Sequence, residues 1–196
     1  MNISLSDTSP KILNICVLGQ SNTGKTALIN RFINGKFPTV HDTTIEDQFN
    51  LPTIIDGIDC QLNITDTAGN ADYQSMLDTW ISNSEGFILV YSVEDKESFI
   101  YVCMIYERIV KIKISKRFSV IIVGNKCELE DKRKVTKEEV EKYCRGLNLQ
   151  CMEISANKDT NVKETFLTLA KGLLKMKYPQ YFKDEEETEK KKCYCF

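Results

Sequence analysis

The chain has 196 residues, 42% of them hydrophobic and 28% charged, which suffices for one domain with a substantial buried core. Its formal net charge of −2 at pH 7 argues against a nucleic-acid partner, because nucleic-acid binding usually needs a basic face. No apolar run reaches the roughly 18 residues of a membrane-spanning helix, and residues 1–10 do not resemble a secretory signal. The eight cysteines include no CxxC pair, which favours free thiols in a reducing cytosol over a disulfide framework or a zinc site.

Apolar patterning predicts strands that alternate with helices. The runs GFILVYS and SVIIVG are almost wholly apolar, which suits strands buried on both faces. Other segments carry apolar residues three and four positions apart, the spacing of one helix face. The expected strands are residues 11–18, 47–55, 58–66, 86–92, 119–124 and 150–155, and the expected helices are 25–34, 95–114, 136–145 and 162–176.

Turn and cap signals refine this pattern. Asp56 and Gly57 separate two strand segments and are typical of a two-residue hairpin turn. Thr136 and Glu139 form a capping box at the start of a helix, and Gly146 is its expected end. On the helix over 95–114, we expect Phe99, Val102, Cys103, Tyr106, Ile109 and Val110 to share the buried face.

These elements predict an α/β fold. Alternating strands and helices favour a mostly parallel sheet with helices on both faces, and the hairpin adds one antiparallel edge strand. From Tyr178 the sequence becomes charged and nearly free of aliphatic residues, which predicts a flexible tail. We therefore expect an N-terminal extension over 1–10, one folded domain over 11–177 and a tail over 178–196.

The sharpest chemical motif is GQSNTGKT, a GxxxxGK[ST] match between a predicted strand and a predicted helix. Backbone N–H groups of such a turn surround a phosphate, and the helix N-terminus adds the positive end of its dipole. Lys25 is expected to reach the terminal phosphates, and the Thr26 hydroxyl to ligate Mg²⁺. The motif assigns nucleotide binding to Gly19, Ser21, Asn22, Thr23, Gly24, Lys25, Thr26 and Ala27.

Asp66 ends a later strand, in the sequence DTAG. An aspartate there can hold Mg²⁺ through water, and the N–H of Gly69 can meet the terminal phosphate. Aspartate and glycine also close ordinary turns at strand ends. The position downstream of a P-loop favours the phosphate role.

The segment NKCE follows another apolar strand, at an edge where open α/β sheets bind ligands. Asn125 can bond the acceptor edge of a base. The Glu128 carboxylate can accept from an imino and an amino N–H together, a pair that guanine offers and adenine does not. The base site expected from this segment and from the later SAN sequence comprises Asn125, Lys126, Glu128, Ser155, Ala156 and Asn157.

In this order and spacing, these segments resemble those of the Ras-family small GTPases over roughly residues 11–177 and the C-terminus. The resemblance implies the P-loop NTPase fold with five parallel strands and one antiparallel strand, GTP and GDP as ligands, and Mg²⁺ as cofactor. It also implies that Thr44 ligates Mg²⁺ in the GTP state, that Phe37 packs on the guanine, and that residues 67–84 form a second switch. The implied effector loop is His41, Asp42, Thr43, Thr44, Ile45, Glu46, Asp47, Gln48 and Phe49.

The implied catalytic residues are Lys25, Thr44, Gly69 and Asn70, and Asn70 departs from the family. Family members usually carry glutamine there to orient the attacking water. Asparagine is one methylene shorter, so we expect slow hydrolysis and a poor response to a GTPase-activating protein that depends on the glutamine. The alternative is that Asn70 is a neutral loop substitution.

Other departures surround the nucleotide. Ser21 and Asn22 stand where Ras has glycines, and their side chains can crowd the water-positioning residue. Glu128 replaces the family aspartate, and Asn157 replaces a lysine that stacks on the base, so we expect weaker guanine binding and faster exchange. His41 stands where Ras has a tyrosine lid, and is either a looser lid or simply exposed.

The last four residues, from Cys193 to Phe196, match a CaaX prenylation signal, and a terminal phenylalanine favours a geranylgeranyl group on Cys193. The lysines at 190–192 would add attraction to an anionic surface. The sequence therefore predicts a lipid anchor at the cytoplasmic face of a membrane, with the plasma membrane as the expected one.

Three functions remain as hypotheses. The first is a signalling GTPase that works with effectors, an exchange factor and an activating protein. The second is a binding scaffold that stays loaded with GTP and does not hydrolyse it. The third is a small P-loop kinase that uses Arg117, Arg133 and Arg145 as phosphate clamps, although it leaves the base motif unexplained.

Overall fold

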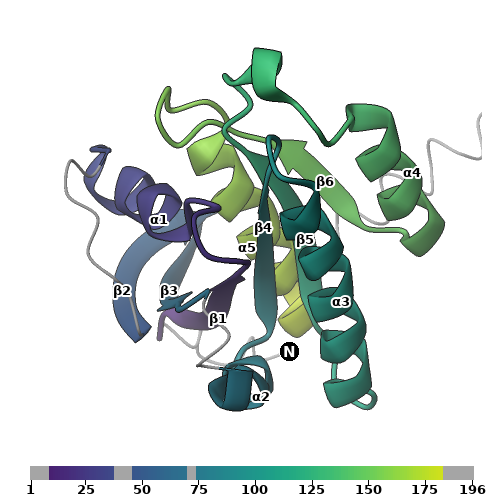
Figure 1. The fold of residues 1–196 in the computed structure, drawn as a ribbon. Coiled ribbons are helices and arrows are strands. Elements are labelled where there is room, and N and C mark those ends of the chain that lie inside the picture. The colour runs from purple at the N-terminus through teal and green to yellow at the C-terminus, as the bar shows by residue number, and fades with distance from the viewer. Residues whose placement is uncertain (1–8, 38–45, 70–73, 183–196) are drawn as a thin grey trace, which may run out of the picture.

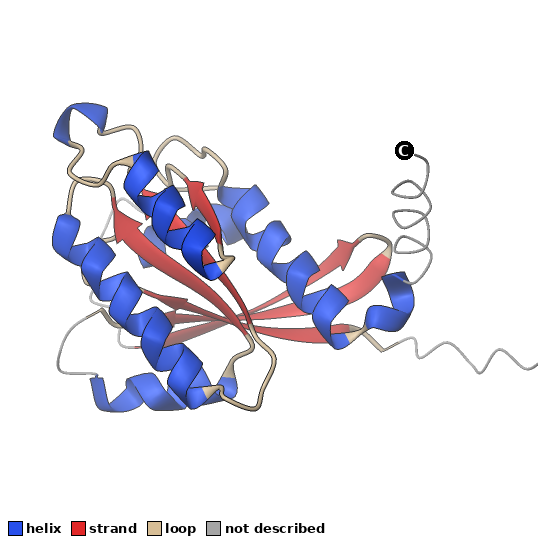
Figure 2. Cartoon of the chain, turned by 90° about the vertical axis from the view of Figure 1, so that its right-hand side faces the viewer, coloured by secondary structure: helices blue, strands red, loops and turns tan. Residues whose placement is uncertain are grey.

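The computed structural model describes residues 9–37, 46–69 and 74–182. Six strands form one sheet in the order β2-β3-β1-β4-β5-β6, with helices on both faces (Figures 1 and 2). Neighbouring strands are parallel except β2, an edge strand antiparallel to β3. The fold class predicted from the sequence is therefore confirmed. The strands are β1 (Lys11–Leu18), β2 (Glu46–Ile55), β3 (Ile58–Thr67), β4 (Gly86–Ser92), β5 (Ser119–Asn125) and β6 (Gln150–Glu153).

Each face of the sheet carries its own hydrophobic core. Helices α1 and α5 cover one face, and α2, α3 and α4 cover the other. Strands β4 and β5 supply alternate residues to the two cores, which explains why their sequences are apolar at successive positions. The helices are α1 (Lys25–Asn34), α2 (Gln74–Asn83), α3 (Lys96–Ile112), α4 (Lys137–Leu147) and α5 (Val162–Lys177), with short 3-10 helices η2 (Glu130–Lys132) and η3 (Pro179–Phe182).

The predicted hairpin turn joins β2 and β3. Asp56 has φ 49° and Gly57 has φ 78°, so both adopt the left-handed conformation that a two-residue hairpin turn requires. The two strands pair along their whole length from this turn. The prediction from the Asp-Gly pair is confirmed.

Two element ends were wrong in the sequence analysis. Helix α4 starts as expected, with the Thr136 side chain accepting from the Glu139 N–H, but it runs through Gly146 to Leu147. Asn148, at φ 54°, ends it, because asparagine tolerates the left-handed conformation almost as glycine does. Strand β6 stops at Glu153, and Ser155 instead exchanges two backbone hydrogen bonds with Thr160.

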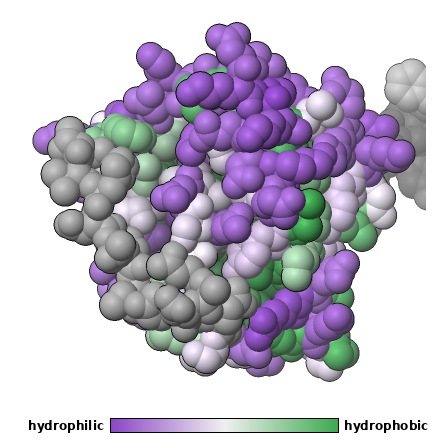
Figure 3. Space-filling model, viewed as in Figure 1, coloured by the Kyte–Doolittle hydropathy of each residue, from purple (hydrophilic) through white to green (hydrophobic). Residues whose placement is uncertain are grey.

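One helix face also differs from the prediction. Val110 was expected on the buried face of α3 and is 41% exposed, while Ile105 is only 4% exposed. Ile105 lies one helical turn before the buried Ile109, whereas Val110 is rotated away from it. Figure 3 shows that this side of the molecule is mostly hydrophilic, with separate hydrophobic patches toward α3. The exposed apolar residues of this region are Ile100, Met104, Val110 and Ile114.

Residues 178–182, assigned to the tail from the sequence, belong to the described, folded part of the chain. The N–H of Tyr178 bonds the carbonyl of Leu174, and η3 follows. Phe182 is 7% exposed and belongs to the core that α1 and α5 cover. The structure thus folds residues 178–182 against the domain, with Tyr178 and Phe182 packed against that core. Within the described part of the chain, no helix has both the length and the apolarity to cross a membrane.

Candidate nucleotide-binding site

The predicted phosphate loop connects β1 to α1. Its glycines are required because neighbouring residues approach the backbone of the loop closely. A Cβ on Gly19 would lie 2.2 Å from the Val90 carbonyl oxygen, and one on Gly24 would lie 2.4 Å from Asn125 Nδ2. Gly24 also has φ 89°, which L side chains rarely adopt. Asn22 has φ 64°, so asparagine, tolerant of this conformation, occupies a position that suits glycine.

Lys25 points into this loop. Its side chain is 6% exposed, and Nζ donates to the Gln20 carbonyl at 3.1 Å, an oxygen that also accepts from Thr23 Oγ1 at 2.8 Å. Burial lowers the pKa of Lys25 to about 8, although the nearby Asp66 charge opposes the shift. A buried ammonium beside a concave turn of N–H groups suits a phosphate, whose charge would favour the protonated lysine.

Asp66 and Thr26 form a pair of oxygen donors beside Lys25. Thr26 Oγ1 donates to Asp66 Oδ2 at 2.6 Å. Asp66 is 0% exposed, and its Oδ1 has no hydrogen-bond partner among the described residues. Burial raises the pKa of this carboxyl, and the Thr26 hydrogen bond partly opposes the change. A buried carboxylate oxygen with unused acceptor capacity, next to a hydroxyl, fits Mg²⁺, which prefers oxygen ligands.

Gly69 brings the end of β3 against the phosphate loop. Its carbonyl accepts the N–H of Ser21 at 3.2 Å. A Cβ on Gly69 would lie 2.3 Å from the Ser21 nitrogen and 2.7 Å from Lys25 Nζ, so only glycine fits without displacement. The structure thus brings together two of the predicted catalytic residues. Thr44, Asn70, His41, Asp42, Thr43, Ile45 and Cys193 lie outside the described residues.

Asn125 joins the base-recognition segments to the phosphate loop. It is 2% exposed, and its Nδ2 donates to the Thr23 carbonyl at 2.8 Å. Its Oδ1 accepts from the N–H of Lys126 at 2.8 Å and from that of Ala156 at 3.2 Å. Within the predicted SAN segment, the Ala156 N–H therefore bonds Asn125 in this structure. Nδ2 carries a second hydrogen, so the amide can still donate to a base.

Glu128 has an unused acceptor. Its Oε2 is buried and has no hydrogen-bond partner among the described residues. Burying an unpartnered carboxylate oxygen costs free energy, which a ligand with N–H donors would recover. The imino and amino groups of guanine are such donors.

No sequence motif indicates Glu94, which pairs with a predicted site residue. Lys126, with φ 64°, extends its Nζ to Glu94 Oε1 at 2.6 Å, and this bond lowers the pKa of Glu94. Glu94 follows β4 as Lys126 follows β5, so both lie at the carboxyl edge of the sheet. That shared edge was the only signal in the sequence that could have indicated the pair.

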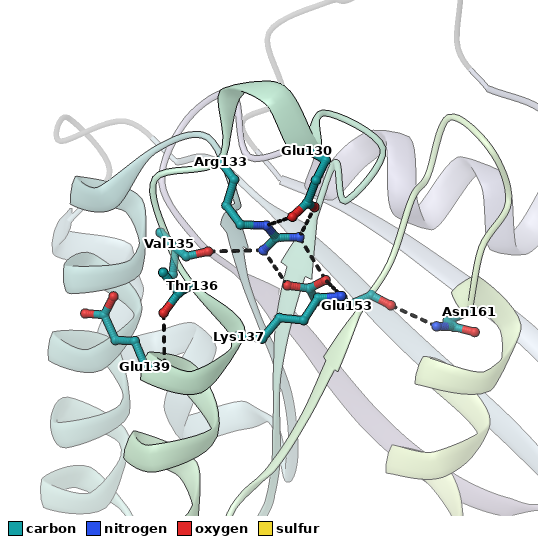
Figure 4. A network of polar contacts seen from close by, with 8 residues as sticks. All are labelled: Glu130, Arg133, Val135, Thr136, Lys137, Glu139, Glu153 and Asn161. Atoms are coloured by element: carbon teal, nitrogen blue, oxygen red, sulfur yellow. Dashed lines mark hydrogen bonds and ion pairs between the residues drawn. The ribbon is translucent and has the colours of Figure 1, made fainter.

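A network of polar contacts around Arg133 links η2, the segment before α4 and the end of β6 (Figure 4). The guanidinium bonds Glu130 at 2.9 and 2.7 Å, Glu153 at 2.6 and 3.1 Å, and the Val135 carbonyl at 3.1 Å. Asn161 Nδ2 donates to the Glu153 carbonyl at 2.9 Å. Arg133 is therefore engaged in structure rather than placed as a phosphate clamp, which removes one residue on which the kinase hypothesis depended.

The described effector-loop residues begin β2. Asp47 and Gln48 are exposed, whereas Glu46 and Phe49 are partly buried. Phe37, expected to pack on a base, is 36% exposed at the other end of the undescribed segment 38–45.

A glycine turn between β1 and α1, with a buried lysine and an aspartate–threonine pair, defines this chain as a P-loop nucleotide-binding protein. The sequence model of the Ras family matches residues 14–175. The Ras-like protein rasW of Dictyostelium discoideum is 35% identical over 181 residues, which cover 92% of this chain and 84% of rasW. The rasX protein of the same organism is 35% identical over 179 residues (91% and 84%), and rasB is 35% identical over 161 residues (82% and 82%). The chain therefore belongs to the Ras family of small GTPases.

Proposed function

We propose that this protein is a guanine-nucleotide switch that binds GTP or GDP with Mg²⁺, hydrolyses GTP slowly and signals to effectors at a membrane surface. The observation that carries this proposal is the buried Oε2 of Glu128, which has no hydrogen-bond partner among the described residues and lies at the sheet edge where Lys25 and Asp66 also lie. A purine with N–H donors beside Glu128 and phosphates beside Lys25 would satisfy groups that otherwise bury charge at a cost.

In hydrolysis, Lys25 and the N–H groups of the phosphate loop stabilise the charge on the transferred phosphoryl group. Bound Mg²⁺ would neutralise further phosphate charge, held by Thr26, Asp66 and, in the GTP state, Thr44. Gly69 offers its N–H to the terminal phosphate. Asn70 reaches the attacking water less well than glutamine would, so the chemical step is slow.

A guanine-nucleotide switch of this kind would have protein partners and a membrane anchor. In the GTP state residues 41–49 would engage effectors, and an exchange factor would reload the protein. A GTPase-activating protein that requires glutamine at position 70 would be ineffective. Geranylgeranylation of Cys193 would tether the chain to the cytoplasmic face of the plasma membrane.

A second candidate is a scaffold that stays loaded with GTP. Asn70 and the left-handed, non-glycine Asn22 favour it, because both alter the surroundings of the attacking water. Single-turnover hydrolysis by the purified full chain separates the two proposals. A measurable rate of phosphate release supports the slow switch, whereas bound GTP that persists for many hours supports the scaffold.

A further inference from the structure

Arg31 of α1 donates to three backbone carbonyls from different parts of the chain. Nε bonds Ala156 at 2.9 Å, Nη2 bonds Asn157 at 3.1 Å, and Nη1 bonds Gly35 at 2.9 Å. The first two acceptors lie 125 and 126 residues away in sequence. Nothing in the motifs indicated this arrangement.

These acceptors lie on two segments that the proposed function assigns as the walls of the base site, the loop of Ala156 and Asn157 and the end of α1 before Phe37. Ala156 and Asn157 belong to the predicted base site, and Asn125 Oδ1 accepts from the Ala156 N–H. Gly35 ends α1 in the left-handed conformation, and its N–H bonds the Arg31 carbonyl at 3.0 Å. Arg31 therefore holds both polar groups of Gly35, which lies two residues before Phe37.

We propose that Arg31 is a positioning residue that fastens these two walls together and so limits how fast the nucleotide leaves. The proposal rests on the proposed guanine-nucleotide function and identifies a control on its exchange step. On this proposal the base leaves when the walls separate, and separation breaks the two charge-assisted hydrogen bonds from Arg31 to Ala156 and Asn157, since the bond to Gly35 lies within the end of α1.

The guanidinium suits this task because its planar fork serves several acceptors at once. A lysine ammonium is a compact point charge that cannot span the same three carbonyls. Arg31→Lys should therefore restore only part of what Arg31→Met removes.

The test uses the full chain loaded with a fluorescent GDP analogue in Mg²⁺, with excess unlabelled GDP added to follow release. Arg145→Met, at an exposed position near the end of α4, is the matched control, since it removes the same charge. We expect Arg31→Met to release nucleotide about tenfold faster, equivalent to ~1.4 kcal/mol. Arg31→Lys should fall between Arg31→Met and the unmodified chain, and Arg145→Met should match the unmodified chain.

Association rates distinguish positioning from general damage. A brace that resists opening should change the association rate constant by less than about twofold, whereas partial unfolding would lower association as well. If Arg31→Met folds poorly, Arg31→Lys carries the same comparison. Release from both Arg31 variants at the control rate would overturn the inference. If the unmodified chain itself retains no GDP, the proposed function fails instead.

Discussion

The indole Nε1 of Trp80 donates a 2.8 Å hydrogen bond to Glu46 Oε2, and so ties helix α2 to the first residue of β2. The other carboxylate oxygen, Oε1, accepts from Gln48 Nε2 at 2.8 Å. Glu46 belongs to the predicted effector loop and Trp80 to the predicted second switch, so this bond connects the two predicted switch segments. No motif in the sequence indicates this contact.

Glu46→Ala should destabilise the protein by ~1–3 kcal/mol, because it leaves the indole N–H of a buried tryptophan without its acceptor. Trp80 is 6% exposed and is the single tryptophan in the chain, so its emission should shift with the substitution. Denaturant unfolding and emission spectra check both effects. Gln48→Ala is the control, since it spares the indole bond, and equal effects from the two variants would contradict this account.

Asn70→Gln should accelerate single-turnover GTP hydrolysis by about tenfold or more. The added methylene extends the amide toward the attacking water, and each 1.36 kcal/mol removed from the barrier gives about tenfold in rate. Quenched-flow or phosphate-release measurements suffice. Asn70→Ala supplies the comparison, and a glutamine variant no faster than the alanine variant would mean that the side chain at 70 does not limit hydrolysis.

Glu128→Asp should strengthen GDP binding by ~1–3 kcal/mol, by restoring the side-chain length that the family uses for a two-bond contact with guanine. Glu128→Ala should weaken binding relative to the unmodified chain, because it removes the acceptor. Dissociation constants from titration with a labelled nucleotide test the pair. Weaker binding by the aspartate variant would show that the pocket is adapted to the longer side chain.

GDP affinity should fall about tenfold between pH 7 and pH 9. The pKa of Lys25 is lowered from 10.5 to about 8, so the nucleotide-free protein loses this charge as pH rises through 8 and must regain a proton to bind phosphate. Between about pH 8 and pH 10.5 the folded chain binds fewer protons than the unfolded chain. The free energy of unfolding of the nucleotide-free protein should therefore rise with pH over that interval. Lys25→Arg keeps its charge, and an equal pH dependence in that variant would exclude Lys25 as the cause.

The parts of the fold that could be predicted are those encoded by neighbouring residues. Asp56 and Gly57 determine their own turn, and alternating cores on both faces explain the apolar runs of β4 and β5. The end of α4 is harder to predict, because Gly146 and Asn148 can both end a helix. In the structure, Asn148 ends it. The charged residues around Phe182 favour a tail in the sequence. Its contacts with the core involve residues distant in sequence, so no local pattern indicates them.

In the candidate site, too, residues within short motifs could be predicted and residues with distant partners could not. Lys25, Thr26 and Asp66 belong to short motifs, and the structure places them together. Arg31 and Glu94 could not be found by motif, because their partners are backbone carbonyls or a lysine 32 to 126 residues away. Such long-range pairings depend on which loops the sheet order brings to one edge.

The most direct test measures how unlabelled GDP, GTP or ATP displaces a labelled GDP analogue from the purified full chain in the presence of Mg²⁺. The account predicts saturable displacement by both guanine nucleotides at concentrations at least about a hundredfold below those needed for ATP, a difference of ~2.8 kcal/mol. Equal displacement by ATP, or no saturable binding of the label, would contradict it.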